Sequence, residues 1–246
     1  MNISVAAEKV FSIAGFPVTN SILVAWIVMI ALVAASLIAT RRVSLVPRGA
    51  QNFFEIVLET ILKLVDSVTG DKRQSLRFFP LVATIFMFVL IGNWLGLLPG
   101  VGSIGIREVH EGKAVLVPLF RSTAADLNFT LALALISVVV VQCVGIASIG
   151  FFKYASRFIN FSNPLNFFVG VLELISEIAK LISFSFRLFG NIFAGEVLLM
   201  VMFFLAPYIV PLPFLFLEVF VGFIQAMVFA MLTLVFLKMS TIESSH

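Results

Sequence analysis

Long apolar runs separated by short polar segments make up most of the chain. Four of them are long enough to cross a bilayer as one helix, at residues 21–39, 78–98, 127–151 and 214–237. A hydrocarbon core about 30 Å thick needs about 20 apolar residues per helical span. The pattern therefore predicts an all-α integral membrane protein.

A fifth apolar run, residues 165–206, contains no proline and is about twice as long as one span needs. As one helix rising about 1.5 Å per residue it would be about 60 Å long. Such a helix must either lie steeply tilted or break near Gly170, Gly190 or Gly195. Because membrane helices tilt by only about 20° on average, a steep tilt needs a functional reason. We expect this run and 214–237 to form a tilted antiparallel hairpin, giving about five membrane-crossing helices.

The segment between the first two spans has a polar stripe, in which Asn52, Glu55, Glu59, Lys63 and Asp66 recur every three or four residues among apolar ones. This period predicts an amphipathic helix on the cytoplasmic face. We divide the single membrane domain, residues 1–246, into four parts. These are the N-terminal segment and first span (1–40), the cytoplasmic loop with its amphipathic helix (41–77), the second and third spans with an outer loop (78–151), and the tilted hairpin (152–246).

Composition and charge support and orient this arrangement. Of the 246 residues 61% are hydrophobic and 12% are charged, against roughly a quarter charged in soluble domains, so a water-soluble domain is excluded. Lysine and arginine favour cytoplasmic loops. The segment after the first span contains Arg41, Arg42, Arg48, Lys63, Lys72, Arg73 and Arg77, and the segment after the second contains only Arg107, Lys113 and Arg121. The N-terminus is therefore predicted outside and the C-terminus in the cytoplasm.

Several kinds of site are not expected in this chain. Its one cysteine, Cys143, lies in an apolar run, and its two histidines, His110 and His246, are far apart, so no zinc cluster is expected. The sequence has no GxxxxGK[ST] phosphate loop for a nucleotide. Its basic residues adjoin apolar spans, which indicates topology and not nucleic-acid binding. We expect no metal, no cofactor and no nucleic-acid partner.

The last two apolar runs carry the candidate chemistry. A charged side chain at the centre of a spanning helix costs about 2.5 to 3.5 kcal/mol, so each one needs a reason. Glu177 and Lys180 are three residues apart and can neutralise each other on one helix face. With Glu173 they can be merely structural. The ionisable residues of these runs are Glu173, Glu177, Lys180, Arg187, Glu196 and Glu218, and the amides Asn191 and Gln225 accompany them.

Arg187 stands out because its guanidinium stays charged at any working pH and no acid lies three or four residues away. In an antiparallel hairpin, residues at equal depth have numbers with a roughly constant sum. This rule predicts a middle layer of Arg187, Asn191 and Gln225, and an outer layer of Glu196 and Glu218. Two carboxylates at one depth can share a proton, since burial and like-charge repulsion both disfavour a second negative charge. An ordinary position facing lipid headgroups remains the alternative for the two glutamates.

Two stretches carry a family resemblance: FRLFGNIFAGE from Phe186 to Glu196, and GFIQAMVFAMLTLVFL from Gly222 to Leu237. They resemble the two signature helices of subunit a of F-type ATP synthases. Supporting segments are GNWLGLLPG from Gly92 and ADLNFTLALAL from Ala125. From position and residue type alone, Asn93 and Trp94 are interpreted as interfacial anchors.

The resemblance implies a role for each matching residue. Arg187 would face the rotating ring of subunit c, attract its deprotonated carboxylate and block a direct proton leak, with Asn191 and Gln225 beside it. Glu196 and Glu218 would belong to the outer half-channel, although the position of Glu218 is a histidine in some bacterial members. Asp126 and Asn128 would lie at its mouth, with a helix N-terminal role as the alternative for Asp126. Ser183 and Glu173 would line the cytoplasmic half-channel; packing of Ser183 and Ser185 between helices is equally possible.

The resemblance also implies partners and a location. The partners would be the subunit c ring, the subunit b peripheral stalk, the remainder of the ATP synthase and the lipid bilayer. The location would be a bacterial plasma membrane, with the mitochondrial inner membrane as the alternative. We therefore expect a proton-translocating stator subunit. A secondary transporter is disfavoured because we find no inverted repeats, and a purely structural respiratory subunit because an unpaired central arginine is costly.

Overall fold

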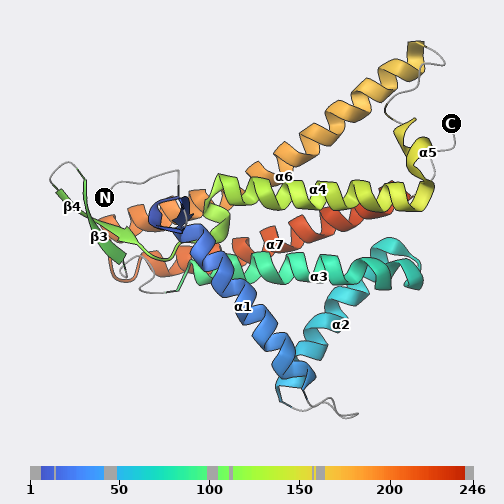
Figure 1. Ribbon diagram of the computed structural model, residues 1–246. Helices are drawn as coiled ribbons and strands as arrows, with labels where there is room; N and C mark the ends of the chain where they lie inside the picture. Colours follow the sequence, from blue (N-terminus) through green and yellow to red (C-terminus); the bar gives the residue numbers. More distant parts are fainter. Residues whose placement is uncertain are drawn as a thin grey trace.

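The computed structural model describes residues 7–13, 15–41, 49–98, 105–110, 113–156, 158 and 164–241 (Figure 1). Within these ranges the α-helices are α1 (Asn20–Thr40), α2 (Ala50–Thr69), α3 (Lys72–Leu95), α4 (Leu127–Ile149), α5 (Phe151–Ala155), α6 (Pro164–Leu205) and α7 (Pro211–Thr241). Of these, α1, α3, α4, α6 and α7 are long and apolar enough to cross a membrane. The predicted membrane protein with five long apolar helices is confirmed.

Two short β-hairpins were not predicted. Strand β1 (Lys9–Ile13) pairs with β2 (Phe16–Thr19), and β3 (Gly105–His110) pairs with β4 (Lys113–Pro118), both antiparallel. Both hairpins lie at the end of the molecule that carries the N-terminus (Figure 1). Each pairs only neighbouring stretches of four to six residues, too short for a periodic signal to separate them from a loop.

The core lies where α3, α4, α6 and α7 pack together. Small residues four apart, Gly222, Ala226 and Ala230, are buried on one face of α7. Small residues let membrane helices approach closely, and close packing is what stabilises such contacts in lipid. Val82 and Phe86 of α3 belong to the same buried cluster. This packing fixes α7 against α3 and so sets the position of everything that α7 carries.

Helix α6 is unbroken over 42 residues, a length of about 63 Å. The helix therefore does not break near Gly170, Gly190 or Gly195, which was one of the two predicted alternatives. Its continuous length supports the other alternative, a tilted helix. Figure 1 shows that the N-terminal half of α6 diverges from α4. Leu165 and Leu172 in its first half are exposed, whereas Leu188 in its second half is buried. The second half contacts α7, which confirms the contact of the last two long helices.

The predicted amphipathic helix is α2. Ile61 and Val65 are buried in the core cluster, and the exposed Lys63 and Glu59 form an ion pair of 3.6 Å. The Lys238 ammonium at the end of α7 donates a hydrogen bond of 2.6 Å to the Val68 carbonyl in the last turn of α2. A cation is favourable at this end of a helix, where carbonyl groups have no partner within the helix.

The ends of the helices alternate as the predicted crossings require. The N-terminal segment and the β3–β4 hairpin lie at one end of the molecule, and α5, the junction of α2 with α3 and the end of α7 lie at the other (Figure 1). Two cations used to predict the orientation, Arg42 and Arg48, lie outside the described residues.

Replacing Lys238 with methionine is expected to lower the thermal unfolding midpoint of the detergent-purified chain by about 3 to 12 °C, since a hydrogen bond from a charged donor contributes about 1.5 to 3 kcal/mol. Lys63→Met is the matched control, because Lys63 is exposed and its ion pair contributes little. Equal midpoints for the two variants would contradict a stabilising contact between α7 and α2.

Candidate functional site

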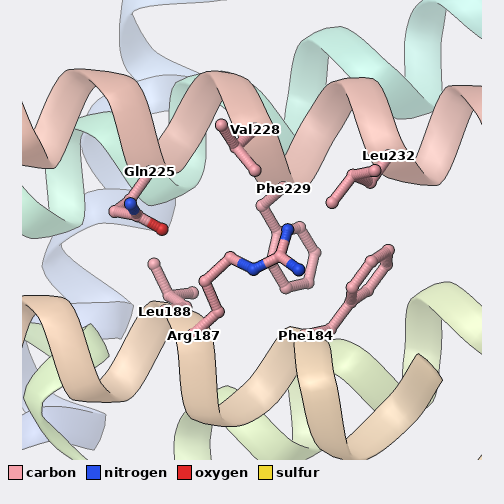
Figure 2. Close-up of a pocket in the computed structure, with 7 residues that line it drawn as sticks. All are labelled: Phe184, Arg187, Leu188, Gln225, Val228, Phe229 and Leu232. Carbon is pink, nitrogen blue, oxygen red and sulfur yellow. The ribbon is translucent and has the colours of Figure 1, made fainter. Parts of the chain in front are cut away.

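Two of the three residues predicted for the middle layer, Arg187 and Gln225, lie together, whereas Asn191 is not part of their pocket. Arg187 of α6 and Gln225 of α7 line one small pocket (Figure 2). Figure 2 shows both side chains in the space between the two helices, with the Arg187 guanidinium near the rings of Phe229 and Phe184 and the Gln225 amide apart from it. The remaining lining residues are apolar: Phe184, Leu188, Val228, Phe229 and Leu232. Arg187 and Gln225 are therefore the two polar residues of an otherwise apolar pocket.

Arg187 is exposed on the surface of α6. Its Nη2 donates a hydrogen bond of 3.3 Å to the Ser183 hydroxyl, one turn earlier in the helix. Asn191, one turn later, is also exposed, as are Ser183 and Gly190. Over the part of the chain that the structure describes, no carboxylate lies within ion-pairing distance of Arg187. A permanent charge on an otherwise apolar helix surface therefore lacks an anionic partner within these residues.

The outer layer is closely packed. Glu218 of α7 is only 4% exposed, and its carboxyl group lies against Gly195 of α6. A Cβ atom on Gly195 would lie only 1.7 to 2.1 Å from the carboxyl atoms of Glu218. Only glycine leaves room for this carboxyl group. Because Glu218 is buried, it does not face lipid headgroups. Its Oε1 is buried and has no hydrogen-bond partner among the described residues.

Glu196 has a partner that the sequence analysis missed. Its Oε2 accepts hydrogen bonds from Arg121 Nε at 3.2 Å and from Arg121 Nη2 at 3.1 Å. Arg121 is 8% exposed and was counted above only as a loop cation. The sequence gives no signal for this contact, because it depends on how the connection before α4 folds back onto α6. The outer layer thus contains the buried acid Glu218 and the ion pair of Glu196 with Arg121.

The residues expected at the channel mouth have local roles in the fold. Asp126 is the N-cap of α4, and its Oδ1 accepts a hydrogen bond of 3.0 Å from the Asn128 backbone N–H. The helix N-terminal alternative for Asp126 therefore describes its geometry. Asp126 is buried, whereas Asn128 is exposed. Asp126 ends the connection that carries Arg121, and Asn128 lies in the first turn of α4.

The 3₁₀ turn η2 (Thr123–Ala125) joins Arg121 to α4 and packs closely on α3. A Cβ atom on Gly92 would lie 2.4 Å from Thr123 Oγ1, and one on Gly96 would lie 2.6 to 2.9 Å from atoms of Ser122. These two glycines of the GNWLG segment therefore make room for the connection that carries Arg121 and Asp126.

Asn93 and Trp94 bind α7, a contact that their interpretation as interfacial anchors did not include. Asn93 is 2% exposed, and its side-chain amide donates a hydrogen bond of 3.2 Å to the Gly222 carbonyl. The Trp94 indole donates one of 3.0 Å to the Val219 carbonyl. Both acceptors lie within one turn of Glu218, so α3 positions the helical turn that carries this acid.

On the other side of Arg187, the predicted pair of Glu177 and Lys180 is present. Lys180 Nζ lies 2.6 Å from Glu177 Oε1 and 4.7 Å from the centre of the Phe236 ring. Glu173, half-buried, lies one turn nearer the start of α6. Ser185 is buried, and its hydroxyl lies 3.2 Å from that of Thr130 on α4, which is the packing role left open for it.

Comparison with known proteins gives consistent matches along the chain. Residues 22–238 match the family model of the ATP synthase A chain. The chain is 37% identical over 243 residues to an ATP synthase subunit a of Syntrophobacter fumaroxidans, covering 98% of this chain and 92% of that protein. It is 36% identical over 230 residues to the ATP synthase subunit a of Geobacter sulfurreducens, covering 92% of this chain and 89% of that protein. It is 38% identical over 224 residues to an ATP synthase subunit a of Campylobacter jejuni, covering 89% of each chain.

Replacing Gly195 with alanine is expected to expose Glu218. The new methyl group takes the space of the carboxyl group, which is the end of a flexible side chain and moves more easily than either helix. A water-soluble carbodiimide should then modify Glu218 several-fold faster in Gly195→Ala than in the wild-type protein. The extent of labelling is measured by mass spectrometry. Gly190→Ala is the matched control, since a Cβ atom there meets nothing within 4 Å. An unchanged labelling rate in Gly195→Ala would mean that the helices separate instead.

Proposed function

This chain belongs to the ATP synthase A chain family, and on that premise we propose how its residues move protons. It is a multi-pass membrane protein and the proton-conducting stator subunit a of an F-type ATP synthase. The observation that carries the residue-level proposal is Arg187, a permanent cation on the exposed surface of α6 with no ion-pairing carboxylate among the described residues.

The face of α6 around Arg187 is proposed to contact the subunit c ring. A charge in hydrocarbon needs a counter-charge, and a carboxylate carried by the ring would supply it. The planar guanidinium binds a carboxylate through two donors and never releases a proton, so it attracts the passing acid without conducting. Gly190 and Ala194, both exposed beside Arg187 and Asn191, would allow another helix to approach closely.

Two half-channels are proposed to meet at Arg187. The outer one would pass Asp126, Asn128, Glu218 and Glu196, and the cytoplasmic one Ser183 and Glu173. Support comes from their order along α6, where Glu196 lies on one side of Arg187 and Ser183 and Glu173 lie on the other. Asn191 and Gln225 would border the arginine between the two. A proton would reach the ring from one side, travel with it, and leave on the other.

The setting follows from the same premise. We place the chain in a bacterial plasma membrane, N-terminus outside and C-terminus in the cytoplasm, as the positive residues of the first loop and the bacterial relatives favour. Its proposed neighbours are the subunit c ring, the subunit b peripheral stalk and the rest of the complex. Nucleotide chemistry is assigned to other subunits, since the sequence contains no phosphate loop.

Arg187→Ala in the assembled complex is expected to abolish ATP synthesis while passive proton flux through the membrane sector remains, because both the attraction and the barrier are removed. Arg187→Lys keeps the charge but loses the planar fork, so synthesis should be severely impaired. Both are measured in vesicles, with Arg77→Ala as the control because Arg77 is exposed at the start of α3. Normal synthesis in Arg187→Ala would refute the proposed role.

Glu218→Gln and Glu196→Gln are each expected to slow ATP-driven proton pumping without releasing the catalytic head from the membrane. An amide cannot take up and pass on a proton as a carboxylic acid does. Pumping is followed by the quenching of a pH-sensitive dye, and the bound head by ATP hydrolysis of washed vesicles. If both variants pump at the normal rate, the outer half-channel does not pass through these residues.

A further inference from the structure

The two acids of the outer layer stand in different surroundings, although they lie close together. Glu196 accepts two hydrogen bonds from Arg121, at 3.1 and 3.2 Å, both at Oε2. Glu218 is buried against Gly195, and its Oε1 has no hydrogen-bond partner within the described ranges. One acid is therefore paired with a fixed positive charge, and the other keeps a buried acceptor atom without a protein donor.

Arg121 cannot serve as a proton donor, because a guanidinium does not deprotonate in proteins. It is 8% exposed, and the Phe193 ring of α6 lies 5.9 Å from its guanidinium carbon. A buried cation of this kind requires an anion, and removing one partner of such a pair is strongly unfavourable. Protonating Glu196 would remove the negative charge that the guanidinium attracts and would weaken both hydrogen bonds to it. Glu196 is thus poorly suited to alternate between its charged and neutral forms.

Arg121 is also held in place by the fold. It lies two residues before η2, whose close packing on α3 depends on Gly92 and Gly96. The same connection ends at Asp126, which caps α4. The backbone that directly follows Arg121 is therefore held in place, and the guanidinium reaches Glu196, 75 residues away in sequence.

We propose that Arg121 is a positioning residue that keeps Glu196 ionised, so that Glu218 alone takes up and releases the proton in the outer half-channel. This inference rests on the proposed function and refines it, because the two acids no longer share one role. Glu196, held by Arg121, accepts hydrogen bonds and orients water or the incoming ring carboxylic acid. Arg121 acts only through Glu196.

The transfer is balanced as a single proton movement. Hydronium on the outer side gives a proton to a carboxylate oxygen of Glu218, and an O–H bond forms there as one breaks in hydronium. Glu218 then gives that proton to the ionised carboxylate of the ring and returns to its charged form. The charges of Glu196 and Arg121 are the same before and after the transfer.

A double-mutant cycle on the assembled complex tests the proposal. Passive proton flux through the membrane sector is measured in vesicles for Arg121→Gln, Glu196→Gln and the double variant, each normalised to the amount of complex. Arg121→Gln should lower the flux about tenfold or more, because an unpaired Glu196 then captures protons itself. Adding Glu196→Gln should restore the flux to within about twofold of Glu196→Gln alone, since the residue that captures protons is gone.

Two further variants control for poor assembly and for the general effect of removing a positive charge. Arg121→Lys preserves the charge beside Glu196 and should retain most of the flux, even if Arg121→Gln assembles poorly. Arg73→Gln is the matched control, because Arg73 is exposed in the first turn of α3 and should leave the flux unchanged. If the losses of Arg121→Gln and Glu196→Gln simply add, Arg121 only supports the fold and the proposal is overturned.

Glu218→Gln separates this inference from the proposed function. Its flux should fall well below that of Glu196→Gln and of the double variant. A normal flux in both Glu218→Gln and Glu196→Gln would refute the outer half-channel itself, whereas a normal flux in Glu218→Gln alone would overturn only the present inference. A double variant as inactive as Glu218→Gln would instead leave the half-channel standing and overturn the present inference, because Glu196 would then carry the proton.

Infrared spectroscopy gives a readout that does not depend on flux. The ring carboxylates are first blocked, and difference spectra between acidic and alkaline buffer then report the carbonyl stretch of protonated acids in this chain. Because other acids of the chain also titrate, each variant spectrum is subtracted from that of the wild type: a carbonyl band should be lost in Glu218→Gln and none should be lost in Glu196→Gln. In Arg121→Gln a second band should appear, and Glu196→Gln should remove it. A wild-type band that is lost in Glu196→Gln would overturn the proposal.

Discussion

A charge surrounded by hydrocarbon must find an opposite charge, and this requirement organises the molecule. The chain meets it in two ways. Arg121 is paired within the chain, through two hydrogen bonds to Glu196. Arg187 forms no ion pair among the described residues and lies exposed on α6. The first arrangement is complete in one polypeptide, whereas in the function proposed above the subunit c ring completes the second.

The placement of these charges depends on close helix packing. Gly195 leaves the space that the Glu218 carboxyl group fills, and Gly222 and Ala226 bring α7 against α3. Hydrogen bonds from Asn93 and Trp94 to the backbone of α7 then fix the turn on which Glu218 stands. Membrane helices gain stability from such packing and from hydrogen bonds across helices. The same contacts that stabilise the core therefore hold the acid in position.

Features with a local cause could be predicted from the sequence. The five long helices follow from the length of the apolar runs, and α2 from its period. The presence of Arg187 and Gln225 in one pocket follows from antiparallel register alone. The contact of Arg121 with Glu196 could not be predicted, because it depends on how the connection after β4 folds back onto α6. The bonds of Asn93 and Trp94 have the same kind of cause, since tryptophan near a helix end also fits an interface. Asp126 remained ambiguous because the same residue type suits a cap and a channel.

The unbroken course of α6 has a mechanical consequence. Its hydrogen-bonded backbone continues through Gly190 and Gly195, on either side of Asn191 and close to Arg187. A hinge at either glycine would let the arginine yield sideways whenever a rotor pushed against it. A continuous helix of about 63 Å acts instead as a stiff bearing surface. Elastic compliance, which a rotary machine needs to smooth its stepwise torque, must then be sought in parts of the assembly other than this helix.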